Sequence, residues 1–193
     1  IMARYTQQCT PWNRLLCARE NTKDLMEIYN RFARYYDADN DDFTDDIPFY
    51  REMAQRTGGP ILEMMCGTGR VLLPLAEEHY TITGVDSSKE MLQIAHEKVD
   101  AAQLTAQVTL IQGDVRTVDL PAEHFSLAFI AVNSFLHLER TAEQMIALQR
   151  MNRTLVHNGI LVLDLLNPDP PRLANDDNQI GRASCRERVS FTV

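Results

Sequence analysis

The sequence predicts an α/β fold in which a doubly wound, mostly parallel sheet is covered by helices on both faces. Apolar, strand-like runs alternate with helical stretches between residues 61 and 165, and a glycine-containing turn follows the first run. Apolar strands separated by helices are typical of a parallel sheet buried on both sides. The right-handed crossover between such strands then gives the doubly wound arrangement.

The individual elements follow from the spacing of apolar residues. Continuous apolar runs predict five strands, and apolar residues three and four positions apart predict three helices after the first strand. The expected strands are 61–65, 81–86, 108–112, 126–132 and 160–165, and the expected helices are 71–79, 89–103 and 141–156.

Two more helices are expected before this alternating part. Apolar residues three and four apart predict a helix over residues 22–36, and residues 47–57 predict a short helix that Gly58 ends. The first residues show no clean period. We therefore divide residues 1–179 into three parts. Residues 1–21 are an unassigned extension, 22–57 form a helical cap, and 58–179 form the sheet domain.

The acidic stretch 37–46 lies between the two helices of the cap. It holds six Asp in ten residues and begins like a calcium-binding loop. That loop needs Gly at its sixth position and Glu at its twelfth, where this chain has Asp42 and Pro48. We therefore expect a solvated acidic loop.

The last residues differ in composition from the rest. Residues 180–189, IGRASCRERV, hold three Arg in seven residues, and their ten codons can be written as a stretch that resembles a common sequencing adapter. We expect 180–193 to be a non-native tail and leave it out of the predicted fold, as one would a fusion scar. A genuine basic tail is the alternative.

Composition restricts the class of protein. A chain of 193 residues with 45% hydrophobic and 24% charged residues suits one globular domain. No apolar run approaches the roughly 20 residues of a membrane span, and the N-terminus lacks a secretory pattern. We expect a cytoplasmic protein with no membrane partner. The net charge of −8 would repel a nucleic-acid backbone and favours a small-molecule partner.

The four cysteines are Cys9, Cys17, Cys66 and Cys185. They form no CxxC pair and have no His partner at zinc spacing. The sequence therefore predicts reduced thiols, with neither a metal site nor a disulfide framework.

The glycine turn after the first strand is the main candidate ligand site. Gly67 and Gly69 permit tight backbone geometry, and the helix beginning near Arg70 offers free amides to a nucleotide. The dinucleotide fingerprint G-x-G-x-x-G requires a glycine where Leu72 stands, which disfavours NAD. Met65 stands where a third close-packed glycine might be expected.

Acidic residues follow three successive strands. Glu63 would repel a pyrophosphate but attract a ligand with an ammonium and a sulfonium group. Asp86, 19 residues after Gly67, is suited to accept hydrogen bonds from ribose hydroxyls, and Asp114 could receive an adenine amino group. We expect the three acids to meet at one edge of the sheet.

At these residues the sequence resembles the class I S-adenosylmethionine-dependent methyltransferases of small-molecule type. ILEMMCGTGR is similar to their first motif, and the second to fifth motifs resemble GVDSSKEMLQIAHEKV, IQGDVRTVDL, FSLAFIAVNSFLHL and LVHNGILVLDLLNP. The agreement covers about residues 25–168. It implies a Rossmann-like methyltransferase fold that uses S-adenosylmethionine and a small-molecule methyl acceptor. The antiparallel hairpin that ends the fold is expected to be missing, which would leave one sheet edge uncovered.

The resemblance also implies roles for individual residues around the cofactor. Those around the methionine part are Glu63, Cys66, Gly67 and Gly69; those around the adenosine are Asp86, Ser87, Met91, Asp114 and Val115; and those beside the sulfonium end are Asn133 and Ser134. Tyr29, Tyr35 and Tyr36 are the aromatic residues that could cap the site, and Tyr36 is preferred among them.

No catalytic residue is implied firmly, because the sulfonium already activates the methyl group. His137 is a candidate general base, and a polar residue on a short helix is the equal alternative. Cys66 is expected to pack rather than to react. The alternative functions are a degenerate, non-catalytic binder of S-adenosylmethionine or a nucleoside, motivated by Met65 and the missing hairpin, and then an NAD-dependent oxidoreductase.

Overall fold

Helices and strands alternate in the computed structural model of the chain much as the sequence predicts. The structure describes residues 33–37 and 43–166, and the backbone of residues 186–192. Residues 33–37 are helical, which agrees with the end of the helix expected over 22–36. The rest of that helix and the extension 1–21 lie outside the described residues.

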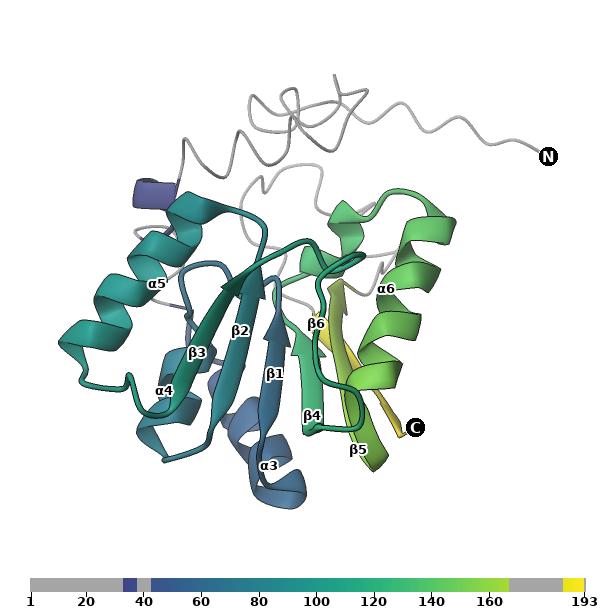
Figure 1. The fold of residues 1–193 in the computed structure, drawn as a ribbon, viewed down its shortest axis with the longest axis horizontal. Coiled ribbons are helices and arrows are strands. Elements are labelled where there is room, and N and C mark those ends of the chain that lie inside the picture. Colours follow the sequence, from purple (N-terminus) through teal and green to yellow (C-terminus); the bar gives the residue numbers. More distant parts are fainter. Residues whose placement is uncertain (1–32, 38–42, 167–185, 193) are drawn as a thin grey trace, which may run out of the picture.

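The sheet contains strands β1 (Ile61–Met64), β2 (Ile82–Asp86), β3 (Val108–Gln112), β4 (Phe125–Ile130), β5 (Leu155–Leu166) and β6 (Arg186–Thr192). Their order is β3-β2-β1-β4-β5-β6 (Figure 1). The first five strands are parallel to their neighbours, and β6 runs antiparallel to β5. Connections therefore diverge between β1 and β4, which is the switch point of a doubly wound sheet.

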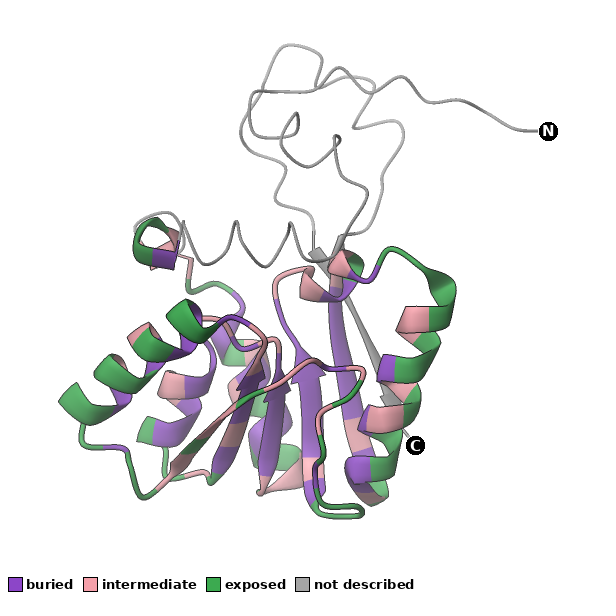
Figure 2. Ribbon diagram, turned by 45° about the horizontal axis from the view of Figure 1, so that its top comes forward, coloured by how far each residue is buried: buried purple, intermediate pink, exposed green. Residues whose placement is uncertain are grey.

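Helices cover both faces of the sheet. On one face α3 (Ile47–Thr57), α4 (Leu72–Glu77) and α5 (Lys89–Ala101) share a core cluster with Ile61 of β1. On the other face α6 (Thr141–Thr154) and the short 3-10 helix η1 (Ser134–His137) share a second cluster with Leu62. Ile61 and Leu62 are both fully buried because successive strand residues point to opposite faces, and Figure 2 shows the buried strands between largely exposed outer helix surfaces. None of the described helices has the length and apolarity that a bilayer crossing requires.

The junction between α6 and β5 differs from the expectation. The helix was expected to reach residue 156 and the strand to begin at residue 160, but α6 ends at Thr154 and β5 begins at Leu155. The register between β4 and β5 shifts between Phe125 and Leu127, and Asn158 is left-handed with φ 63°. The polar stretch that resembles a turn in sequence is therefore a bulge inside a strand.

The expectation of an uncovered sheet edge is wrong. The backbone of Arg186–Thr192, a segment expected to lie outside the fold, pairs with β5 from Leu166 back to Ile160. An edge strand offers a row of unpaired amides and carbonyls, and almost any extended segment satisfies them. Codon resemblance and charge carry no information on such pairing, so one antiparallel strand is present where none was expected.

Candidate functional site

The glycine turn connects β1 to α4 at the carboxyl edge of the sheet. Gly67 and Gly69 have φ values of 55° and 84°, the left-handed region that glycine adopts at no steric cost. A Cβ on Gly67 would meet nothing within 4 Å, and one on Gly69 would make only ordinary contacts from 3.7 Å. Backbone conformation, rather than lack of space, is therefore what requires glycine at both positions.

Met65 adopts the same conformation without being glycine. Its φ is 60°, and its partly buried side chain packs against the core cluster on the α6 face, which includes Val85 and Phe135. Left-handed backbone costs a residue with a Cβ about 1 kcal/mol or more. The apolar packing offsets part of that cost, which explains how the turn tolerates a methionine.

Asp86 joins the glycine turn to the end of β2. Its Oδ2 accepts a hydrogen bond from the Gly67 amide and its Oδ1 one from the Ser88 amide, each at 2.8 Å. Burial raises the pKa of this carboxyl, and the amide hydrogen bonds oppose the rise. A carboxylate has about four lone-pair sites, more than the amides of Gly67, Ser87 and Ser88 occupy. The predicted pair of Gly67 and Asp86 is thus brought into direct contact, and Asp86 still has acceptor capacity for a ligand hydroxyl.

Glu63 is a buried acid next to this pair. It is 2% exposed, and its Oε2 has no hydrogen-bond partner among the described residues. Burial raises its pKa to about 8; Arg70 opposes the rise, whereas Asp46 and Asp86 add to it. Without a cationic ligand the side chain is therefore mostly neutral at pH 7, and a bound cation would favour its ionised form.

Cys66 lies in the turn beside Glu63. Its side chain is buried, and burial together with the nearby charges of Glu63 and Asp86 raises the pKa of its thiol well above the ordinary value. A thiol of this kind is not a nucleophile. The expectation that Cys66 packs rather than reacts agrees with this environment.

An ion pair fastens residues of the acidic stretch to the glycine turn. Arg70 donates to both carboxylate oxygens of Asp46, at 2.7 and 2.6 Å, and to the carbonyl of Phe43 at 2.7 Å. Thr68 donates to Asp37 at 2.6 Å, and Lys98 of α5 pairs with the same carboxylate at 2.8 Å. These contacts hold Asp37, Phe43 and Asp46 against the turn.

This docking corrects the expectation of a solvated acidic loop. Asp46 is fully buried and Asp37 bridges two partners, so at least these two members of the stretch are structural. Arg70 is a further residue of the site that the sequence patterns did not predict. The available signal was a lone cation at the end of a glycine turn, with an unexplained acidic stretch upstream.

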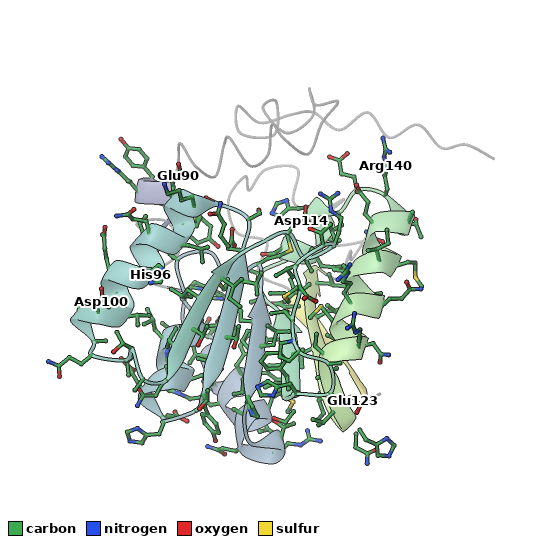
Figure 3. All side chains as sticks on the ribbon, viewed as in Figure 1. Glu90, His96, Asp100, Asp114, Glu123 and Arg140 are labelled. Atoms are coloured by element: carbon green, nitrogen blue, oxygen red, sulfur yellow. The ribbon has the colours of Figure 1, made fainter. Side chains whose placement is uncertain are left out.

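Asp114 follows β3 at the same edge of the sheet, and Figure 3 places it near the end where α6 begins. Its Oδ1 accepts from the Arg116 amide at 2.8 Å and from Arg116 Nε at 2.9 Å. These bonds lower the pKa of the carboxyl. Arg116 also reaches Glu143 of α6 at 2.6 Å. The Arg116 side chain therefore holds Asp114 and connects it to α6. Val115 beside it is buried.

The remaining predicted residues lie around the starts of α5 and η1. Ser87 is half-buried, Met91 is buried, and the Met91 amide donates to Ser88 Oγ at 3.2 Å, which caps α5. Asn133 and Ser134 follow β4, and burial lowers the pKa of His137, the last residue of η1.

The predicted aromatic cap is partly described. Tyr36 is half-buried and interacts electrostatically with Arg70. Tyr35 is exposed, and Tyr29 lies outside the described residues. Of the three tyrosines, Tyr36 is therefore the one seen next to the turn.

Two hollows among the described residues are lined by neither Gly67 nor Asp86 nor Asp114. One, between the sheet and α6, includes Met64 and Met151 in its lining, and the other includes Glu123 and His157. Figure 3 shows Glu123 at the opposite end of the molecule from Asp114. The candidate site is therefore defined by its donors, acceptors and charges rather than by either hollow.

Comparison with known proteins identifies the family. Residues 61–159 match the family described as "Methyltransferase domain". The chain belongs to this family. The ubiquinone/menaquinone biosynthesis C-methyltransferase UbiE of Syntrophotalea carbinolica is 32% identical over 161 residues, which is 79% of this chain and 65% of UbiE. The resemblance seen in the sequence motifs is thus confirmed.

Solved structures share the fold. The methyltransferase CcbJ from Streptomyces caelestis is 30% identical with a TM-score of 0.61, over 65% of this chain and 51% of CcbJ. The [4+2]-cyclase SpnF is 23% identical with a TM-score of 0.63, over 75% of this chain and 60% of SpnF. The Rossmann-like fold is confirmed. The chain spans less than two thirds of the length of each of these relatives.

Proposed function

We propose that the chain is the cofactor-binding domain of an S-adenosylmethionine-dependent methyltransferase that acts on a small molecule. The observation that carries the proposal is the 2.8 Å bond between the Gly67 amide and Asp86, with the buried acid Glu63 beside it. This arrangement offers acceptors for ribose hydroxyls and negative charge for a cationic tail. A pyrophosphate would be repelled by the Asp86 carboxylate and, unlike a cation, would not favour the ionised form of Glu63.

The roles of the predicted residues are part of this proposal. Asp86 receives the ribose, with Ser87 and Met91 beside the adenosine; Asp114 and Val115 meet the adenine; Glu63, Cys66, Gly67 and Gly69 surround the methionine part; Asn133 and Ser134 lie beside the sulfonium; and Tyr36 caps the site. Residues 22–57 are proposed to form a helical cap beside the sheet domain 58–179. The contacts of Arg70 with Asp46 and of Thr68 with Asp37 support that assignment.

The chemistry asks little of the protein beyond positioning. S-adenosylmethionine, when bound, supplies an activated methyl group for attack by a nucleophilic atom of the acceptor. The residues of the chain hold the two reactants in line and exclude water. Burial lowers the pKa of His137 and so favours its neutral form, which is the form that can accept a proton. We propose it as the base for acceptors that must lose a proton.

The acceptor is proposed to be a small molecule, and the location the cytoplasm. A net charge of −8 opposes binding to nucleic acid. Cys66 is a free thiol, and free thiols are typical of the reducing cytosol.

Calorimetry on the full chain tests the cofactor. S-adenosylhomocysteine, the reaction product, is expected to bind, and NAD is expected to show no heat of binding at the same concentration. Binding of NAD with no response to S-adenosylhomocysteine would overturn the proposal in favour of an oxidoreductase. Sinefungin, which carries an amine in place of the methylsulfonium, serves as a second ligand with the cationic tail.

A second candidate is a binder of S-adenosylmethionine that transfers no methyl group. Met65 in the glycine turn favours it, because the backbone there is left-handed without glycine. Incubation with S-adenosylmethionine and a panel of phenols, amines and quinols separates the two. A methyltransferase releases S-adenosylhomocysteine with one of them, whereas tight binding without any turnover supports the binder.

A further inference from the structure

The loop that leaves β4 combines several unfavourable features in two residues. Val132 and Asn133 are both left-handed, with φ values of 56° and 59°. That conformation is uncommon outside glycine, and for a β-branched residue such as valine it is an outlier. Asn133 also has a buried side-chain Oδ1 with no hydrogen-bond partner among the described residues. Each feature is unfavourable in free energy, so the surroundings must hold the loop in place.

Asp164 of β5 supplies contacts that do so. The amide of Val132 donates to its carboxylate Oδ2 at 3.3 Å, and the amide of Asn133 donates to its main-chain carbonyl at 3.1 Å. Asp164 is 0% exposed and directly follows Leu163, which pairs with the last residue of β4. Two successive amides of the strained loop are therefore bonded to one buried residue of the neighbouring strand.

We propose that Asp164 is a positioning residue of the site, which holds Val132 and Asn133 in the left-handed conformation and so presents Asn133 at the switch point between β1 and β4. The proposal rests on the proposed function, because that function places Asn133 beside the reacting end of the cofactor. The buried Oδ1 of Asn133 has no donor among the described residues. We therefore infer that the ligand donates a hydrogen bond to it from an N–H or O–H group.

A merely structural loop would not need this arrangement. Glycine at position 132 would adopt the same φ without strain and without a buried acid beside it. Glycine at position 132 would allow many backbone conformations. Val132, with its amide bonded to the Asp164 carboxylate, is held in the left-handed one. Val132 also packs against the core cluster on the α4 face, so its side chain is anchored while its amide is held by Asp164.

Four variants of the full chain test the proposal: Asp164→Leu, Asp164→Asn, Val132→Gly and the combination of Asp164→Leu with Val132→Gly. Amide hydrogen exchange at residues 132 and 133 reports the loop, and calorimetry gives the dissociation constant of S-adenosylhomocysteine. Asp164→Leu removes the acceptor of the Val132 amide but keeps the main-chain carbonyl that bonds the Asn133 amide. It should therefore speed exchange most at Val132, and at Asn133 as the loop loosens, and weaken binding roughly two- to tenfold, the scale of a lost hydrogen bond. Asp164→Asn keeps an oxygen acceptor and should restore protection and affinity.

The combined variant distinguishes positioning from general stabilisation. Because glycine adopts the left-handed conformation by itself, Val132→Gly should make affinity independent of residue 164, so the combined variant should bind as well as Val132→Gly alone. A role in stability alone predicts a lower Tm for Asp164→Leu on either background and no such rescue. If Asp164→Leu does not fold, Asp164→Ser on both backgrounds gives the same comparison.

The outcomes separate this inference from the proposed function. A native chain that fails to bind S-adenosylhomocysteine overturns the function, and hydrogen exchange then still tests whether Asp164 holds the loop. A native chain that binds, with unchanged exchange in Asp164→Leu, overturns the inference alone. Faster exchange without rescue by Val132→Gly also overturns it.

Discussion

The ends of β2 and β3 each carry an aspartate at the carboxyl edge of the sheet, and the chain holds the two in different ways. Asp86 is bonded to the main-chain amides of Gly67 and Ser88 and is largely buried, so desolvation raises its pKa. Asp114 is bonded mainly to Arg116, its side chain is 35% exposed, and its pKa is lowered.

The difference means that the position of Asp86 is fixed by the main chain, whereas that of Asp114 can adjust. Main-chain amides in a tight turn do not change partners without local unfolding, so Asp86 is part of the turn itself. Arg116 can rotate away from Asp114, and a partly exposed ion pair of this kind contributes about 1 kcal/mol or less and weakens with salt. We therefore expect ligand affinity to depend much more on Asp86 than on the contact between Asp114 and Arg116.

Removing Asp86 is the strongest test of this comparison. Asp86→Ala removes the proposed ribose acceptor and leaves the amides of Gly67 and Ser88 without their bonds. We expect the binding of S-adenosylhomocysteine to weaken by about 1–3 kcal/mol, measured by calorimetry. Asp119→Ala, which removes an exposed acid elsewhere on the sheet domain, is the matched control. Equal dissociation constants for Asp86→Ala and the control would contradict the ribose role.

The buried acid at the end of β1 predicts a pH dependence. The pKa of Glu63 is raised to about 8, so the free site holds a proton below that pH, whereas a bound cation favours the ionised form. Binding should therefore release a proton, and affinity should rise about tenfold for each pH unit between 6 and 7 and level off near 8. Calorimetry in two buffers of different ionisation enthalpy measures the proton release.

Glu63→Gln is the control for this dependence. A glutamine has no proton to release, so the variant should bind more weakly at pH 8 and show little change between pH 6 and 8. A native chain with the same flat profile would mean that Glu63 does not meet the cationic part of the ligand.

The smallest effect is expected at the adjustable acid. Arg116→Gln removes the ion pairs with Asp114 and Glu143 but leaves the Asp114 carboxylate in place. We expect affinity for S-adenosylhomocysteine to change by less than about 1 kcal/mol, with a weaker response to salt between 50 and 500 mM than in the native chain. A loss as large as that of Asp86→Ala would show that Asp114 is as fixed as Asp86.

Local sequence patterns predicted the sheet and the glycine turn. The contacts that they did not predict join residues far apart in the sequence. Gly67 and Asp86 could be paired from sequence because a strand, a turn and the next strand have regular spacings. The bond of Arg70 to Asp46 and that of Val132 to Asp164 join segments 24 and 32 residues apart, with no periodic signal between them. The three acids also looked alike in sequence, although burial and partners give Glu63, Asp86 and Asp114 different proton affinities.

The central claim is that an adenosyl ligand with a cationic tail lies against the glycine turn, between Glu63 and Asp86. An amide-resolved NMR titration of the full chain with S-adenosylhomocysteine tests it most directly. The account predicts saturable shifts at Gly67, Gly69 and Ser88, and their loss in Asp86→Ala. Saturable shifts confined to the hollow beside Met64 and Met151, with the glycine turn unchanged, would contradict it.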